Sequence, residues 1–275
     1  MTIDTAKFLI QRAGVQSYCT GADLITKLQP GDLMAVTRPG DGTYKWVKPI
    51  TKYKYRYTID TEGKTAGNTS FKLSVLSNVF TILFDVNWGD GTEDTGVTDN
   101  EILHTYPSVG IYSIEVTTDE LHPWRTGRGY ADEMQMILSF DGCDDDFPFG
   151  GSIQNMFFTA SKLTSIEPFD TTGITNFNAA FKDCTSYTGA FPFLDTSSGT
   201  NFGNAFNGSN WSSFPLIDCS SGLNFNEAWS FCMQLTSFPQ LDLSSGTTFN
   251  ETWRMCQFTA FPEISFDSAT SLNAT

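Results

Sequence analysis

A run of three aspartates near the middle of the chain is the best candidate for chemistry in the sequence. Asp144, Asp145 and Asp146 follow one another, and hard cations such as Ca²⁺ prefer several carboxylate oxygens as ligands. The run lacks the alternating ligand positions and the closing glutamate of an EF-hand loop. We therefore treat these three residues as a candidate calcium site, with a solvated acidic loop as the alternative interpretation.

Other catalytic or metal-binding constellations are hard to assemble from this sequence. The only histidines are His104 and His122, which argues against a Ser-His-Asp triad and against a histidine zinc site. No Gly-x-Ser-x-Gly, P-loop or dinucleotide-binding fingerprint occurs. Asp90, Asp94 and Asp99 form a second acidic group, weaker than the first. Apart from Ca²⁺ at the aspartate run, the sequence predicts no cofactor and a protein that is not an enzyme.

From residue 151 onward the chain repeats itself about every 24 residues, and this period must position any binding side chains. The period is visible in the prolines and also in the aromatic anchors. The prolines are Pro168, Pro192, Pro215, Pro239 and Pro262, and the anchors are Phe157, Phe181, Phe206, Trp229 and Trp253. A fixed period of this length is typical of a solenoid, in which each unit is too small to bury its own apolar face. Such arrays usually bind or scaffold, because they present a long continuous surface.

Each repeat has two halves that predict different local structures. The first half places apolar residues at i, i+3, i+4 and i+7, as in Phe225, Ala228, Trp229 and Cys232, which predicts a short helix with one apolar stripe. The second half, such as 235–242, is short, rich in β-branched and aromatic residues and interrupted by proline, which predicts a short strand. One helix, one turn and one strand per repeat make an α/β, leucine-rich-repeat-like solenoid of about five coils.

The turns between repeats carry a regular row of aspartates. Asp170, Asp195, Asp218 and Asp242 precede Ser/Thr and glycine residues, so we expect them to stack and to bond nearby loop amides. A row of carboxylates with Ser/Thr neighbours can alternatively bind sugars or cations.

Three cysteines occupy the last position of the apolar stripe. Cys184, Cys232 and Cys256 share this position with Ala160 and Ser209, which indicates a demand for a small side chain. We predict buried, reduced thiols there, since free cysteine behaves as a small hydrophobe. A disulfide or a metal site is the weaker alternative.

Two motifs in the repeats point to a known family. Asn-Phe-x-x-Ala-Phe/Trp-x-x-Cys runs from Asn176 to Cys184 and from Asn224 to Cys232, and Phe-Pro-x-Leu/Ile-Asp follows. These motifs resemble the BspA-like and mycoplasma-lipoprotein-type repeats, a branch of the leucine-rich-repeat superfamily. The resemblance covers about five copies and implies a binding role at a cell or virion surface, without catalysis.

A second pair of motifs lies upstream, in residues 51–120. Trp88-Gly89-Asp90-Gly91-Thr92 reads as a tight turn between strands, and His104-Thr-Tyr106 precedes Gly110-Ile-Tyr112. The pair resembles the PKD domain, an immunoglobulin-like β-sandwich, and implies a spacer or adhesion module. His104 belongs to this motif, so we expect a structural role for it.

The first fifty residues contain two similar segments. Residues 8–18 and 33–44 each read as a strand, a glycine-containing turn and a second strand that begins near a tyrosine, which predicts two β-hairpins. A helix candidate covers 21–28. The region is similar to N-terminal attachment modules of tailed-bacteriophage structural proteins.

The sequence therefore predicts a multidomain, mainly β protein. Its parts are an attachment module (1–50), a PKD-like sandwich (51–120), a connector (121–150) and the solenoid (151–275). The net charge of −15 makes nucleic acid and anionic membranes poor partners. No apolar run is long enough to span a membrane, so we expect no membrane insertion.

We expect a virion-surface protein, either a head decoration protein or a tail fibre. The first residues lack the basic and apolar regions of a signal peptide, which favours synthesis in a host cytoplasm over export. Residues 1–50 would contact other virion proteins, and the solenoid would contact a host-surface glycan or protein. The alternative is a bacterial cell-surface adhesin. The last coil has no polar capping unit, so we expect either that 261–275 fold back over it or that copies of the chain associate there as a homo-oligomer.

Overall fold

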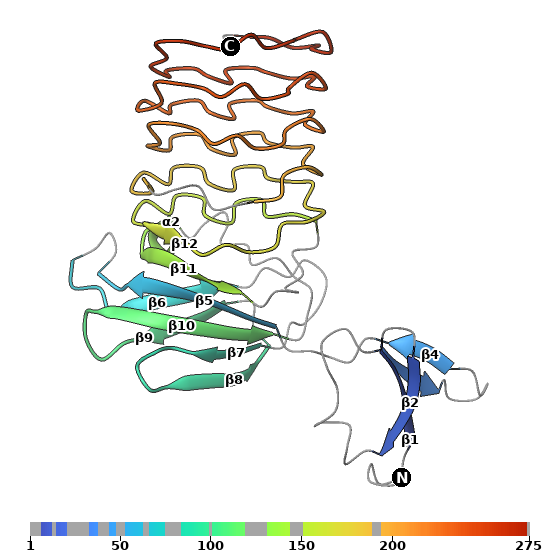
Figure 1. Ribbon diagram of the computed structural model, residues 1–275. Helices are drawn as coiled ribbons and strands as arrows, with labels where there is room; N and C mark the ends of the chain where they lie inside the picture. Colours follow the sequence, from blue (N-terminus) through green and yellow to red (C-terminus); the bar gives the residue numbers. More distant parts are fainter. Residues whose placement is uncertain are drawn as a thin grey trace. The chain divides into compact units, whose positions relative to one another are not determined.

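The structure is a computed structural model, and it describes most of the chain (Figure 1). The described residues are 7–12, 15–20, 33–37, 44–47, 53–62, 66–74, 84–98, 101–118, 131–143, 151–188 and 194–273. They divide into two compact units, Met1–Lys52 and Tyr53–Thr275. Regular structure is almost entirely β, and the single helix in the described ranges is α2 (Ala131–Met134).

The N-terminal unit contains the two predicted hairpins. Strand β1 (Lys7–Arg12) pairs with β2 (Val15–Thr20), and β3 (Leu33–Thr37) pairs with β4 (Tyr44–Val47), both antiparallel. Strands β1 and β3 join the hairpins into one sheet of order β2-β1-β3-β4. The helix candidate at 21–28 lies outside the described residues.

The second unit begins with two sheets, which are antiparallel except for one parallel pair, β11 and β12. Its strands are β5 (Tyr53–Asp60), β6 (Ser70–Ser74), β7 (Phe84–Asn87), β8 (Glu93–Val97), β9 (Glu101–Thr105), β10 (Ile111–Thr118), β11 (Ile137–Cys143) and β12 (Ser165–Ile166). One sheet has the order β12-β11-β5-β10-β7-β8, and β6 and β9 form a second, two-stranded sheet. Part of the region 121–150, expected to be a connector, thus supplies β11 to the larger sheet.

Alternation along β5 shows how the sequence builds this core. Tyr53, Tyr55, Tyr57 and Ile59 are buried, whereas the residues between them are partly exposed. Successive side chains of a strand point to opposite faces, so one face of β5 enters the core. Lys54 on the other face contributes an ion pair to Glu115 of β10.

Residues 151–188 and 194–273 form a stack of coils above this sheet (Figure 1). We number the coils 151–173, 174–199, 200–222, 223–246 and 247–269. One ladder of parallel bridges runs through all of them, at Ser152, Asn176, Asn201, Asn224, Thr248 and Ser271. The side chains add a second ladder, since Asn224 Nδ2 donates to Asn201 Oδ1 at 2.9 Å.

The predicted helices are wrong. No helix occurs in the described parts of the stack, and the apolar stripe is a succession of tight turns. Backbone N–H groups alternate between two acceptors: Ala180 donates to Phe177 three residues back, whereas Phe181 donates to Ala205 in the next coil. Every fourth residue here has a positive φ, as at Ala179 and Asp183, and a helix does not tolerate this.

The turns reproduce the helical stripe for a geometric reason. Four-residue turns, like helical turns, return i and i+4 to the same side, so the sequence spacing alone does not distinguish them. The observed turns differ from a helix in their hydrogen bonds, because every second backbone amide donates to the neighbouring coil and not to its own coil.

Aromatic side chains fill the centre of the stack. The predicted anchors form a column, with ring centroids 5.5 Å apart for Phe157 and Phe181 and 5.9 Å apart for Trp229 and Trp253. Phe140 of β11 packs against Phe157 at 5.7 Å. The first coil also supplies β12, which pairs in parallel with β11. The sheet and the stack therefore share one hydrophobic core.

Candidate functional site: the aspartate turns and their hollows

The predicted aspartate row forms one side of the stack. Asp195 Oδ1 accepts hydrogen bonds from the backbone N of Ser197 at 3.0 Å and from its Oγ at 2.6 Å. Asp242 and Ser244 repeat this arrangement at 3.0 and 2.7 Å. The same pattern occurs at Asp218, so the prediction that these side chains bond loop amides is confirmed.

These hydrogen bonds favour the ionised form of Asp195 and Asp242. The Ser197 hydroxyl, followed by the Ser197 amide, lowers the pKa of Asp195 below its ordinary value. The hydroxyl and then the amide of Ser244 lower the pKa of Asp242 in the same way. The turns therefore place a row of negative charges along the stack at neutral pH.

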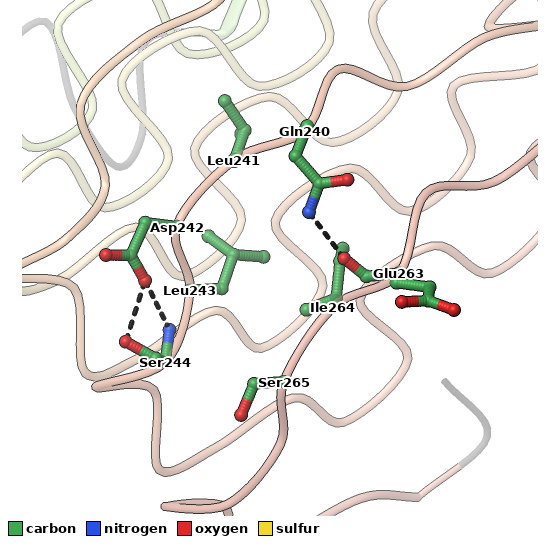
Figure 2. A pocket seen from close by; sticks show the side chains of 8 residues that line it. All are labelled: Gln240, Leu241, Asp242, Leu243, Ser244, Glu263, Ile264 and Ser265. Carbon is green, nitrogen blue, oxygen red and sulfur yellow. Dashed lines mark hydrogen bonds between the residues drawn. The ribbon is translucent and has the colours of Figure 1, made fainter.

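Two hollows open beside the aspartate turns. One, of about 770 Å³, lies between the fourth and fifth coils (Figure 2). Its lining residues are Gln240, Leu241, Asp242, Leu243, Ser244, Glu263, Ile264 and Ser265. The other, of about 500 Å³, spans the first three coils and includes Asp170, Asp195 and Asp218. Leu241 and Leu243 are buried, so the first hollow has an apolar floor between polar walls.

The side-chain donors on this side change along the stack. In the lower coils Thr171 Oγ1 donates to the carbonyl of Asp195 at 2.9 Å, and Thr196 Oγ1 donates to that of Asp218 at 2.7 Å. The corresponding position is leucine in the fourth coil, Leu243, which has no donor. Across the upper hollow, the coils are linked instead by Gln240 Nε2, which donates to the carbonyl of Glu263 (Figure 2).

The hollows are suited to binding by hydrogen bonds. The aspartate oxygen that the turn does not use, together with serine hydroxyls and backbone carbonyls, accepts hydrogen bonds from a ligand. Among the residues that line the two hollows there is no histidine, cysteine, lysine or arginine. Nucleophile and base pairs of the serine or cysteine hydrolase type therefore have no counterpart in these hollows.

The calcium candidate of the sequence falls elsewhere. Asp144, Asp145 and Asp146 lie outside the described residues, as does Asp99. Within the described ranges, no group of three or more His, Cys, Asp or Glu side chains is arranged to hold a metal ion. Asp94 instead accepts a hydrogen bond from Trp88 Nε1 at 2.8 Å.

His104 has the structural role that the sequence predicted. It lies in β9, its ring is stacked on Trp88 at 4.5 Å, and its Nε2 is 2.9 Å from Asp90 Oδ2. Burial acts to raise the pKa of Asp90, but hydrogen bonds from Thr92 and His104 outweigh it and lower this pKa to about 2. The sequence analysis missed the Asp90–His104 pair, although both residues belong to the two motifs of this region.

The prediction of buried thiols is confirmed for Cys184 and Cys232, whereas Cys256 is only partly buried. Cys184, Cys232 and Cys256 are reduced thiols, and burial raises the pKa of each, to about 11 for Cys256. Each thiol donates to a carbonyl of the preceding coil, as Cys232 Sγ does to Phe206 at 3.1 Å. Ser209 donates in the same way at 2.8 Å. Four of the five coils thus have a small hydrogen-bond donor at this position, and Ala160 of the first coil fills it by size alone.

In the part of the chain that the structure describes, no helix has the length and apolar character needed to cross a bilayer. Comparisons of the chain with protein-family models, with curated proteins and with solved structures gave no match.

Proposed function

We propose that the chain is a non-enzymatic structural and adhesion protein of a bacteriophage virion, a head decoration protein or a tail fibre. In this proposal residues 1–50 attach it to other virion proteins. The sheet region is a PKD-like, immunoglobulin-like spacer, and the stack is a BspA-like solenoid built from turns instead of helices.

One observation carries the binding part of the proposal. Asp195, Asp218 and Asp242 accept hydrogen bonds in equivalent turns, beside two hollows along one side of the stack. A regular row of acceptors suits a ligand with many hydroxyl donors, such as a host-surface glycan.

The attachment part rests on the N-terminal unit. Residues 1–52 form a compact unit with its own four-stranded sheet, separate from 53–275. A separate unit can bind a particle while the rest of the chain binds a ligand. The phage assignment itself comes from the resemblance of this segment to attachment modules of tailed-bacteriophage structural proteins.

Immunogold electron microscopy tests the proposal. Antibodies raised against the full chain are applied to particles and to intact cells from a culture that expresses it. Labelling of virions is expected, and a variant that lacks 1–50 is expected to lose that labelling. Labelling confined to the bacterial envelope would overturn the proposal in favour of a cell-surface adhesin.

A further inference from the structure

The third coil contains the only Asn-Gly pair in the sequence, Asn207-Gly208. An asparagine before glycine is especially prone to deamidation, because glycine has no side chain to hinder attack of its backbone nitrogen on the asparagine amide. Coils on both sides contact this pair. Asp183 N donates to the Asn207 carbonyl at 2.7 Å, and Gly208 N donates to the Ser230 carbonyl at 2.8 Å.

Packing explains why a glycine stands at position 208. The equivalent residues of the second and fourth coils are Asp183 and Phe231, which have a positive φ just as Gly208 has. The backbone conformation alone therefore does not demand glycine here. An added Cβ at Gly208 would lie 2.1 Å from Asp183 Oδ1, so the carboxylate occupies the space that a side chain would need. The labile pair is a consequence of how Asp183 packs.

The native contacts hold both reacting groups. Asn207 is 3% exposed, and its Nδ2 donates to Asn204 Oδ1 and to Glu227 Oε2, each at 3.2 Å. The attacking nitrogen is held by the hydrogen bond from Gly208 to Ser230 of the fourth coil. Ring closure requires Gly208 N to lose its proton and to approach Asn207 Cγ. The hydrogen bond to the fourth coil must therefore break before the reaction can occur.

We propose that Asn207 is a deamidation site that is protected in the intact stack and reacts when the third and fourth coils separate. Hydroxide removes the proton of Gly208 N, this nitrogen forms a bond to Asn207 Cγ, and Nδ2 takes a proton from water and leaves as ammonia. The product is a succinimide ring. Water then opens the ring at one of its two carbonyls and gives aspartate or isoaspartate. Neither step needs an oxidant or a reductant.

Deamidation converts a reversible separation of the coils into a lasting one. The new carboxylate would face Glu227 Oε2, which accepts a hydrogen bond from Asn207 in the intact stack, and the two like charges repel. The isoaspartate product also routes the backbone through the side-chain carbon, which lengthens the third coil and disturbs its register with the fourth. The inference goes beyond the proposed function and does not depend on it.

Peptide mapping of the full chain by mass spectrometry tests this inference. The protein is incubated at mildly alkaline pH with and without urea, and the aspartate and isoaspartate forms of Asn207 are quantified over time. We expect deamidation in native buffer to be at least about tenfold slower than in urea, because only the opened fraction of the native protein reacts. Asn210, an exposed asparagine of the same coil that precedes tryptophan, is the internal control and should react slowly in both conditions.

Two alanine variants test the role of the side-chain contact. Glu227→Ala removes an acceptor of Asn207 and should speed the native reaction by about threefold or more, with no change in urea. Glu251→Ala is the matched control. Glu251 is the equivalent residue of the fifth coil, with φ of 54° against 53° for Glu227, and it bonds Arg254 instead. Its replacement should leave the rate at Asn207 unchanged.

A product mimic tests the consequence for the stack. Asn207→Asp should lower Tm by at least about 4 °C, because it places an unpaired charge at a buried position. Asn210→Asp, which loses an exposed hydrogen bond to the Thr185 carbonyl, should lower Tm by less. Glu227→Gln added to Asn207→Asp should restore much of the loss, because the glutamine amide can donate to the new carboxylate.

Three results would overturn the inference. These are equal deamidation rates of Asn207 in native buffer and in urea, equal native rates in Glu227→Ala and Glu251→Ala, and equal Tm values for Asn207→Asp and Asn210→Asp. The first comparison uses the wild-type chain, so it decides the question even where a variant fails to fold. Folding of each variant is checked by circular dichroism.

Discussion

Replacement of Trp229 by alanine should destabilise the whole unit 53–275. The indole is completely buried, stacked between Phe206 at 5.7 Å and Trp253 at 5.9 Å, and edge-on to Phe238 at 4.9 Å. Its Nε1 has no hydrogen-bond partner among the residues that the structure describes, so the expected loss comes from packing. Removal of a buried tryptophan costs about 3–5 kcal/mol in transfer free energy and cavity formation. For a unit of this size, that loss lowers Tm by roughly 6–20 °C.

Urea and thermal unfolding followed by circular dichroism measure this effect. Met233→Ala is the control, because Met233 lies in the same coil but is 47% exposed, and it should change the free energy of unfolding by less than about 0.5 kcal/mol. Since sheet and stack share one core, Trp229→Ala should shift a single transition that includes both. A Tm equal to that of Met233→Ala would refute the placement of Trp229. A shifted transition for the stack with an unshifted one for the sheet would refute the shared core.

Three other perturbations follow from the structure. Gly208→Ala should destabilise the stack by more than about 1 kcal/mol, because Gly208 has φ of 70° and an added Cβ would lie 2.1 Å from Asp183 Oδ1. Gly173→Ala is the control in the same denaturation assay. Gly173 has φ of 74°, but an added Cβ there would meet no atom within 4 Å, so this variant measures the backbone contribution alone. Cys232 should resist thiol reagents in the native protein and react with them after denaturation. Detection by mass spectrometry of a disulfide between two repeat cysteines would contradict this prediction. The contribution of Asp90 to stability should be complete above about pH 4, its unfolded range, and be lost as the pH falls through about 2. Asp90→Asn should therefore flatten the pH dependence of unfolding in that window, and an unchanged profile would argue against the His104 and Thr92 contacts.

The sequence identified the repeat and its anchors because they follow from spacing alone. Phe157, Phe181 and Trp229 recur with the period, and only stacking of the repeats buries all of them. The hairpins of the first unit could also be predicted from the sequence, because a short apolar strand and a glycine turn specify local pairing. Both features are local or periodic, and a single sequence records such features directly.

The local structure within each repeat could not be predicted from the sequence in the same way. Turns at residues such as Ala179 and Asp183 require a positive φ, yet glycine marks only a few of these positions, as at Gly208. The decisive interactions are hydrogen bonds between residues about 24 apart, which local propensity does not include. Likewise, the donor role of Cys232 depends on a carbonyl in the preceding coil, and β11 joins the sheet through pairing with β5.

The candidate binding site was predicted in part. The Asp-x-Ser turns were recognisable as capped loops, since the side chain and the amide it binds are two residues apart. The residue after each aspartate is threonine in the first two coils, cysteine in the third and leucine in the fourth, and the two threonines donate hydrogen bonds to the next coil. That difference has a meaning only once neighbouring coils are placed against each other.

Cryo-electron microscopy of purified virions from a culture that expresses the chain tests the central claim most directly. The account predicts density for a stack of coils, spaced about 4.8 Å apart as in neighbouring strands, that projects from the particle surface with residues 1–50 at the attachment point. Virions without such density, from a culture in which the chain is present in the bacterial envelope, would contradict it.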